Sequence, residues 1–178
     1  MEYEVIRSNR KTLAVQIHSD RVLVRAPTCA TNEDIRRFLL EHRGWIEKHL
    51  AKQQAAAALP KLTMEDIHQL ADRAMEVIPR RVRYYAPLVG VTYGRITIRN
   101  QRSKWGSCSS QGNLNFNCLL MLAPPEVIDS VVVHELCHRK EMNHSPRFYA
   151  EVYRVFPEYD KWNKWLKENG GAILSRMI

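Results

Sequence analysis

The feature that most constrains this chain is the run VVVHELCHRKEMNH at residues 131–144, which places two histidines four positions apart. On an α-helix such residues lie one above the other, so the imidazoles of His134 and His138 can bind one cation from a single rigid element. Glu135 lies about 100° further round the helix, beside that cation. Neutral imidazoles preserve the Lewis acidity of zinc, and a neighbouring carboxylate can take a proton from the water that zinc activates. The pattern therefore predicts a catalytic metal site with Glu135 as general base.

The metal-site prediction requires a helix, although three successive valines could also begin a buried strand. The flanking residues favour the helix. Pro124-Pro125-Glu126 is typical of a helix start, and Ile128, Val132 and Leu136 recur at four-residue steps. These signals, with a third histidine nearby, also disfavour a chance pentapeptide whose histidines are only hydrogen-bonded.

The third metal ligand is less firmly indicated by spacing alone. His144 follows His138 by 144 − 138 = 6 positions, as in the HExxHxxGxxH pattern of metzincins, but Glu141 stands where those proteins have glycine. Ser145-Pro146 predicts the cap and first residue of another helix, which would put His144 in a corner between two helices. Glu141 and Glu151 remain open as substitutes, because other zincins use a glutamate there.

The rest of the sequence predicts an α+β fold with antiparallel sheets packed on helices. Short β-branched runs near the N-terminus read as a three-strand meander, and Thr31 with Asp34 predicts the capped start of one helix after it. A second strand pair is expected to be antiparallel. The expected strands are residues 3–7, 12–17, 22–25, 91–99 and 113–117.

Helices are expected over most of the remaining chain. Residues 51–62, with four consecutive alanines and then Pro60, read as a helix tail or a linker. The stretch 63–88 predicts one bent helix or two, because Pro79 interrupts it. The helices after Pro124 are expected to break near Asn143 and Pro157 and to end at Gly170-Gly171.

A length of 178 residues suits a single domain with its own core. We expect residues 1–178 to form one domain, with the N-terminal β-meander plus helix at residues 1–58 and the catalytic core at residues 63–178. No apolar stretch approaches the roughly 18 residues that span a bilayer, and the start lacks the pattern of a secretory signal. The expectation is a soluble cytoplasmic protein with no membrane partner.

Charge and cysteine content add two expectations. The formal net charge of +8 would attract acidic or phosphate-rich partners, so a nucleic-acid face and a merely solvated basic surface both stay open. The four cysteines form no CxxC pair, which favours reduced thiols. Cys137, inside the histidine run, is interpreted as a small buried residue rather than a ligand. Nothing in the sequence indicates the oligomeric state.

Two segments carry a resemblance to the YgjP-like metallopeptidase family, zincins related to the SprT-like and WLM proteases. One is residues 133–138 continuing into MNHSPRF at 142–148, and the other is RSKWGSCS at 102–109 leading to NLNFN at 113–117. Cys137 and Tyr149 depart from the family pattern. The resemblance implies a small zincin-like fold, one Zn²⁺ per chain held by His134, His138 and His144, and Glu135 as general base.

Substrate contacts are the least constrained part of the interpretation. By the resemblance, Trp105, Gly106 and Ser107 would lie beside an extended substrate, although a simple strand-to-strand turn explains them equally well. Tyr149 and Tyr153 are candidates for stabilising an oxyanion because they follow His144 closely.

The leading hypothesis for function is peptide-bond hydrolysis on a peptide or protein substrate. The first alternative is hydrolysis of a nucleotide phosphoanhydride, as in a nucleoside triphosphate pyrophosphatase, with the phosphates held by basic side chains. The candidates for that role are Arg95, Arg99, Arg102, Lys104 and Arg147. The second alternative is a SprT-like protease that acts on protein bound to DNA, which predicts salt-dependent DNA binding.

Overall fold

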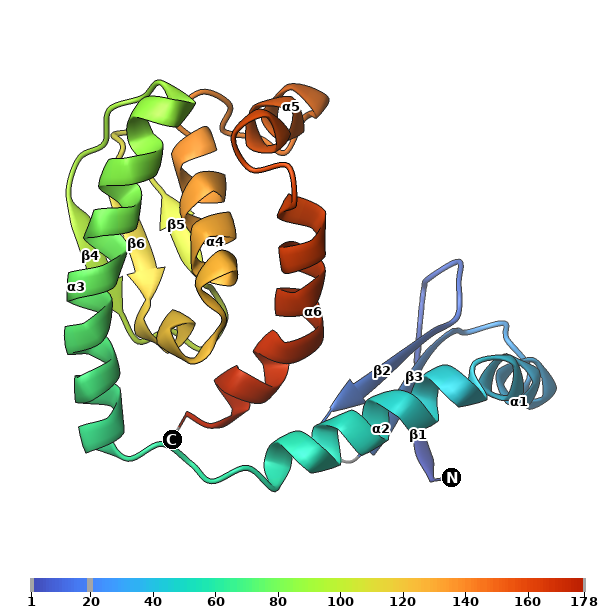
Figure 1. Cartoon of the computed structure of the whole chain (residues 1–178). Coiled ribbons are helices and arrows are strands. Elements are labelled where there is room, and N and C mark those ends of the chain that lie inside the picture. Colours follow the sequence, from blue (N-terminus) through green and yellow to red (C-terminus); the bar gives the residue numbers. More distant parts are fainter. Residues whose placement is uncertain (1, 19–20, 178) are drawn as a thin grey trace. The chain divides into compact units, whose positions relative to one another are not determined.

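The computed structural model describes residues 2–18 and 21–177 and divides into two compact units, Met1–Pro60 and Lys61–Ile178. Within these residues there are six α-helices and two three-stranded sheets, one sheet in each unit (Figure 1). The predicted α+β class is confirmed. Antiparallel sheets were predicted, but each sheet contains one parallel and one antiparallel strand pair.

In the N-terminal unit the strands are β1 (Tyr3–Ser8), β2 (Ala14–His18) and β3 (Arg21–Pro27). Their order is β1-β3-β2, with β1 parallel and β2 antiparallel to β3, so the predicted meander is wrong. The inward side chains of β3, Val22 and Val24, are completely buried, whereas β1 is almost wholly exposed. The most apolar strand therefore takes the central position, where both of its edges are paired.

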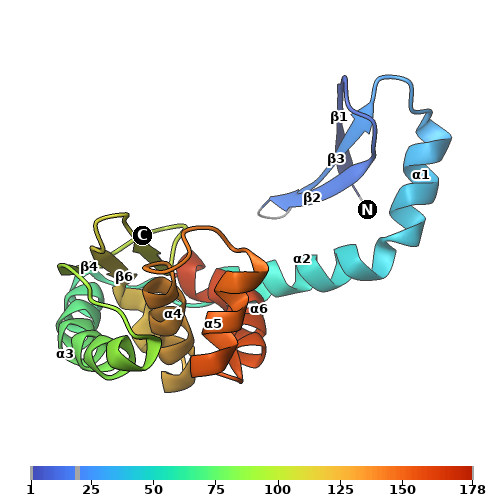
Figure 2. The ribbon, with the colours of Figure 1, turned by 90° about the horizontal axis from the view of Figure 1, so that it is seen from above.

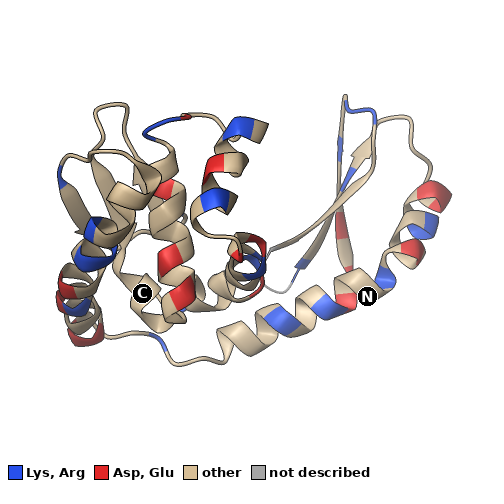
Figure 3. Cartoon of the chain, turned by 45° about the horizontal axis from the view of Figure 1, so that its top comes forward, with Lys and Arg blue, Asp and Glu red and all other residues tan. Residues whose placement is uncertain are grey.

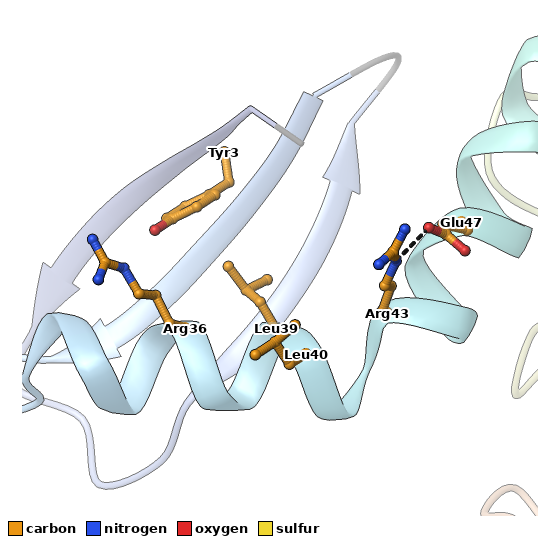
Figure 4. Close-up of a pocket in the computed structure, with 6 residues that line it drawn as sticks. All are labelled: Tyr3, Arg36, Leu39, Leu40, Arg43 and Glu47. Atoms are coloured by element: carbon orange, nitrogen blue, oxygen red, sulfur yellow. Dashed lines mark hydrogen bonds and ion pairs between the residues drawn. The ribbon is translucent and has the colours of Figure 1, made fainter.

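The helical pattern after β3 forms two helices, α1 (Asn32–Glu41) and α2 (Arg43–Ala57), where one was predicted. The predicted cap is confirmed, because Thr31 and Asp34 form a capping box at the start of α1. The two helices meet at an angle (Figure 2), and Ile35 and Ile46 pack in one small core with β3. A hollow at this bend is lined by Tyr3, Leu39 and Leu40, with arginines at its rim (Figure 4). The predicted helix tail is confirmed, since α2 ends at Ala57 and Pro60 lies in the following link.

The C-terminal unit begins with α3 (Met64–Val89), which runs as one helix through Pro79. Its sheet contains β4 (Ile96–Arg99), β5 (Gly106–Cys108) and β6 (Leu114–Asn117), in the order β4-β6-β5. The predicted antiparallel pairing of residues 91–99 with 113–117 is wrong, because β4 is parallel to β6. Part of the segment read as a turn forms β5, which makes the antiparallel pair with β6. The chain therefore enters β6 in the same direction as β4.

The other elements of this unit are the 3₁₀ helix η1 (Cys118–Leu122), α4 (Pro125–Cys137), α5 (Pro146–Val155) and α6 (Tyr159–Ser175). Figure 1 shows α4 between α3 and α6, with the sheet against α3 and α4. The helix predicted for the histidine run is confirmed, and it is buried on nearly every side. The predicted stop at Gly170-Gly171 is wrong, since α6 continues to Ser175. Packing of Gly170 against Trp105 outweighs its low helix propensity.

None of the helices in residues 2–18 and 21–177 has the combination of length and apolar character that crossing a bilayer requires.

Candidate metal centre

Three imidazoles converge where α4 ends and α5 begins. His134 lies in the last turn of α4, His138 caps that helix, and His144 stands just before Ser145, whose side chain caps α5. Nε2 of His134 lies 3.2 Å from Nε2 of His138 and 3.1 Å from Nε2 of His144, and all three donor atoms lie within 4.8 Å of one another. In a tetrahedral zinc site with Zn–N distances of 2.0–2.1 Å, neighbouring nitrogens are about 3.3–3.4 Å apart. The two separations from His134 are close to this value, and three histidine nitrogens are a donor set that zinc accepts.

The second ring nitrogen of each of the two histidines on α4 is held by a specific partner. Nδ1 of His138 lies 3.0 Å from the carbonyl oxygen of Glu141, and a carbonyl only accepts, so Nδ1 carries the proton and Nε2 keeps its lone pair. Nδ1 of His134 lies 2.7 Å from the hydroxyl of Tyr159 at the start of α6. Donation from Nδ1–H to this hydroxyl leaves Nε2 of His134 available to a metal.

The three imidazoles pack against one buried aromatic ring. Phe148 on α5 is completely buried, and its ring centroid lies 4.9 Å from that of His134, 4.6 Å from His138 and 4.9 Å from His144. Ring contacts of this kind restrict the rotamers of the histidines. The convergence of the nitrogens is thus fixed by packing from α5 as well as by the helix α4.

Burial also sets the protonation state of the histidines. It lowers the pKa of His134 to about 3, with smaller contributions from the proximity of His138 and His144. Burial likewise lowers the pKa of His138, partly opposed by its hydrogen bond to Glu141. Both rings are therefore neutral at pH 7, which is the form that binds a metal.

Glu135 is 6% exposed and lies against the backbone of β5. A Cβ built on Gly106 would stand 2.6 Å from Oε1 of Glu135, so only glycine leaves room for this carboxyl group. Burial raises the pKa of Glu135 to about 8, and the positive charge of Lys104 opposes that rise. A divalent cation beside the carboxyl would shift its equilibrium back toward the ionised form.

A cavity of about 200 Å³ opens between β5, α4 and α6, and both His134 and Glu135 line it. Trp105 and Gly106, which the family resemblance would place beside an extended substrate, form part of its wall. Ser107 does not line it, because its hydroxyl accepts a hydrogen bond from Asn115 on the neighbouring strand. The substrate roles of these residues remain predictions.

The other candidates for substrate binding lie elsewhere. Arg102 and Arg147 are exposed and do not line the cavity. Tyr149 is half-buried, with its ring centroid 6.3 Å from that of His144. Tyr153 donates a hydrogen bond to Asp160.

The two alternative metal ligands do not join the histidine group. Glu141 contributes only its backbone carbonyl to His138, and the carboxylate of Glu151 is held by Lys140 at 2.9 Å and Arg154 at 2.8 Å. Cys137 is completely buried, and burial raises its pKa to about 12. Its interpretation as a small core residue is consistent with both observations.

Sequence reasoning missed Tyr159 and the contacts of Phe148. Tyr159 follows His134 by 25 residues, and no spacing rule connects the two positions. Phe148 entered the sequence analysis only as the last residue of the segment MNHSPRF at 142–148. A hydrogen-bond partner for each metal-binding histidine can be expected in general, but its identity depends on how α6 packs against α4.

Comparison with known proteins places the chain in a family. The family profile described as YgjP-like, metallopeptidase domain, matches residues 11–70 and 64–169. No curated protein matches the chain in sequence. Among solved structures, the metallopeptidase zymogen abylysin of Pyrococcus abyssi is similar at a TM-score of 0.46 and 20% identity, over 51% of this chain and 93% of that one.

The metallopeptidase zymogen jannalysin of Methanocaldococcus jannaschii is similar at a TM-score of 0.46 and 22% identity, over 52% of this chain and 95% of that one. The family match covers well over half of the chain, in both compact units. The chain belongs to the YgjP-like metallopeptidase family.

Proposed function

We propose that this chain is a zinc-dependent peptidase in which His134, His138 and His144 hold one Zn²⁺ and Glu135 is the general base. The observation that carries the proposal is the convergence of the Nε2 atoms of three histidines, one of which, His134, lines the same cavity as Glu135. We also propose that the two units act together as one metallopeptidase domain, because the family match includes residues of both.

The chain's own residues supply two functions in this reaction. The three histidines contribute neutral nitrogens and no charge, which keeps the bound cation strongly electrophilic. Zinc in such a site polarises a carbonyl oxygen and lowers the pKa of water to about 7. Glu135 takes the proton from the attacking water at its carboxylate and passes it to the departing amine. Its burial keeps competing solvent away and makes the carboxylate a stronger base than an exposed glutamate.

The test separates metal binding from proton transfer. Wild type, Glu135→Gln and His138→Ala are purified, their zinc content is measured by mass spectrometry, and hydrolysis of casein is followed with and without chelator. We expect Glu135→Gln to retain zinc and to lose at least about 100-fold in turnover, as for other general bases. His138→Ala should lose zinc and activity together, because only two imidazoles remain.

Glu126→Gln is the matched control, since Glu126 is an exposed glutamate in the first turn of the same helix. It should change neither zinc content nor turnover. Unchanged turnover in Glu135→Gln would remove that residue from the mechanism, and full zinc content in His138→Ala would remove the ligand assignment.

The two alternative functions are tested on the same samples. Nucleoside triphosphates are assayed beside casein, and DNA binding is measured across a salt series, where neutralisation of phosphates predicts a steep decline. Figure 3 shows acidic and basic residues on the helices of each unit. If the protein hydrolyses nucleoside triphosphates but not casein, the peptidase proposal is wrong and the phosphoanhydride hydrolase takes its place.

A further inference from the structure

The cavity beside Glu135 is lined by apolar and by polar side chains. Trp105, Val131 and Leu166 line it with carbon atoms, contributed by the loop before β5, by α4 and by α6. Its volume of about 200 Å³ corresponds to the space of roughly seven water molecules in the liquid. This is room for one amino-acid side chain. A side chain in the cavity would lie next to His134 and Glu135, which belong to the same lining.

Two polar side chains of the cavity make no hydrogen bond or close ion pair within the part of the chain that the structure describes, although the charge of Lys104 also acts on Glu135. Lys104 is exposed at the cavity and has neither an ion pair nor a hydrogen bond through its ammonium group. Asn163 is half-buried on α6, and its amide makes no hydrogen bond among the described residues. By contrast, the hydroxyl of Ser130, also in the wall, already donates to the carbonyl of Val127.

Polar side chains in the lining of a cavity indicate which chemical group would bind there. An ammonium has three donors and no acceptor, whereas the amide of Asn163 offers both a donor nitrogen and an acceptor oxygen. The charge of Lys104 therefore decides that the complementary group is an acceptor with negative charge, to which the amide nitrogen of Asn163 can also donate. A cationic side chain would be repelled by Lys104, and an aliphatic one would leave the amide of Asn163 without a partner.

We propose that this cavity binds a carboxylate of the peptide substrate next to the scissile bond, with Lys104 and Asn163 as the residues that determine specificity. The apolar lining residues hold the carbon chain that carries the carboxylate, and Lys104 and Asn163 pair with its oxygens. The inference rests on the proposed peptidase function. The carboxylate belongs either to an Asp or Glu side chain or to the C-terminus, and the experiment distinguishes these two sources.

Specificity is measured first by cleavage. A peptide library derived from a whole proteome is digested with wild type and with Lys104→Met, which removes the charge and keeps most of the apolar stem. Wild type should cut preferentially beside Asp or Glu, or beside a free C-terminus, and Lys104→Met should lose about 3–10-fold of that preference. Asn163→Leu should reduce the same preference, and Lys104→Glu should shift it toward Lys and Arg.

Lys164→Met is the matched control, because Lys164 is an exposed lysine beside Asn163 on α6 and does not line the cavity. It removes the same unit of net charge and should leave the cleavage preference unchanged. If Lys164→Met lowers the preference as much as Lys104→Met, the effect is general electrostatic attraction and the proposal is overturned. Equal frequencies of Glu and Gln beside the cut sites, together with no preference for bonds beside a free C-terminus, overturn it as well.

Binding without turnover separates this inference from the function it rests on. The full-length, zinc-loaded Glu135→Gln protein is titrated with Ac-Ala-Ala-Glu-Ala-NH2, with its Gln counterpart, and with the Gln peptide as a free acid. Tighter binding of the Glu peptide assigns the cavity to a side chain, and tighter binding of the free acid assigns it to a C-terminus. Such discrimination supports the cavity assignment even if wild type cuts no peptide, whereas equal affinities refute it even if casein is hydrolysed.

Discussion

The backbone of Gly106 lies directly against the carboxyl group of Glu135, so that a Cβ at position 106 would stand 2.6 Å from Oε1 and 2.8 Å from Cγ. These separations are shorter than the contacts that real Cβ atoms make. The position of Glu135, the proposed base, therefore depends on the absence of a Cβ atom at position 106 of β5. Glu135 is fixed from one side by its own helix and from the other by this close approach of a strand.

Replacing Gly106 should displace the base without removing the ligands. We expect Gly106→Ala to lower the free energy of unfolding by about 1–3 kcal/mol, the usual cost of overpacking, and to reduce casein hydrolysis at least about tenfold. Zinc content should remain near that of wild type, because position 106 contributes no donor atom. Gly171→Ala is the control, since a Cβ there has no neighbour within 4 Å. Equal activities of the two variants would show that Glu135 does not depend on this contact.

Removing the hydroxyl of Tyr159 should weaken metal binding specifically. Tyr159→Phe keeps the buried ring but loses the 2.7 Å hydrogen bond to Nδ1 of His134, which orients that imidazole. We expect the apparent Kd for zinc, measured by competition with a chelating dye, to rise about 10–100-fold. Tyr153→Phe is the control. It loses a hydrogen bond to Asp160 rather than to a histidine, so its zinc affinity should not change. An unaltered Kd in Tyr159→Phe would contradict the positioning role.

The pair Arg81–Asp129 should be a main electrostatic contribution to stability. Arg81 on α3 donates to both carboxylate oxygens of Asp129 on α4, at 2.5 and 2.6 Å, and Tyr85 donates to the same carboxylate at 3.2 Å. Asp129 is only 8% exposed, so Arg81→Met would leave a buried, unpaired charge.

We expect Arg81→Met to reduce the free energy of unfolding by about 2–4 kcal/mol in urea titrations, somewhat less than for a fully buried pair because Arg81 is partly exposed. The neighbouring pair Arg80–Glu76 is exposed on both sides, and Arg80→Met should cost less than about 1 kcal/mol. Similar losses in the two variants would refute a special role for Arg81.

The stability of the metal-free protein should fall as pH rises, through Glu135. Burial raises the pKa of this group from 4.5 to about 8, so the fold favours its protonated form. The resulting stabilisation is fully present below pH 4.5, where the unfolded chain is protonated too, and it is lost as pH rises through 8. Glu135→Gln has no such proton to lose.

With chelator present, we expect the unfolding free energy of wild type to decline relative to Glu135→Gln across this range, by about 1.4 kcal/mol for each unit of pKa difference. The unfolding free energies of the two proteins are measured by chemical denaturation at several pH values. Parallel curves for the two proteins would mean that the carboxyl is not buried in the metal-free state.

The sequence by itself determined the local parts of this protein. Pro125 at the helix start, the four-residue apolar repeat and the spacing of His134 and His138 predicted the helix α4 and its paired imidazoles. The caps at Thr31 and Ser145 were likewise readable, because a capping side chain bonds backbone atoms within three residues of itself. These signals act between neighbouring residues, so they can be recognised without knowing which other segments pack against them.

Only the tertiary structure decided which segments meet. Strand pairing was misjudged in both units because strand order depends on which strand buries the most surface, and local alternation does not report that. The partner of His134 comes from α6, and the room for Glu135 comes from a glycine on β5. Both contacts join residues distant in sequence, so they arise from packing the whole unit around α4, and no local pattern can encode them.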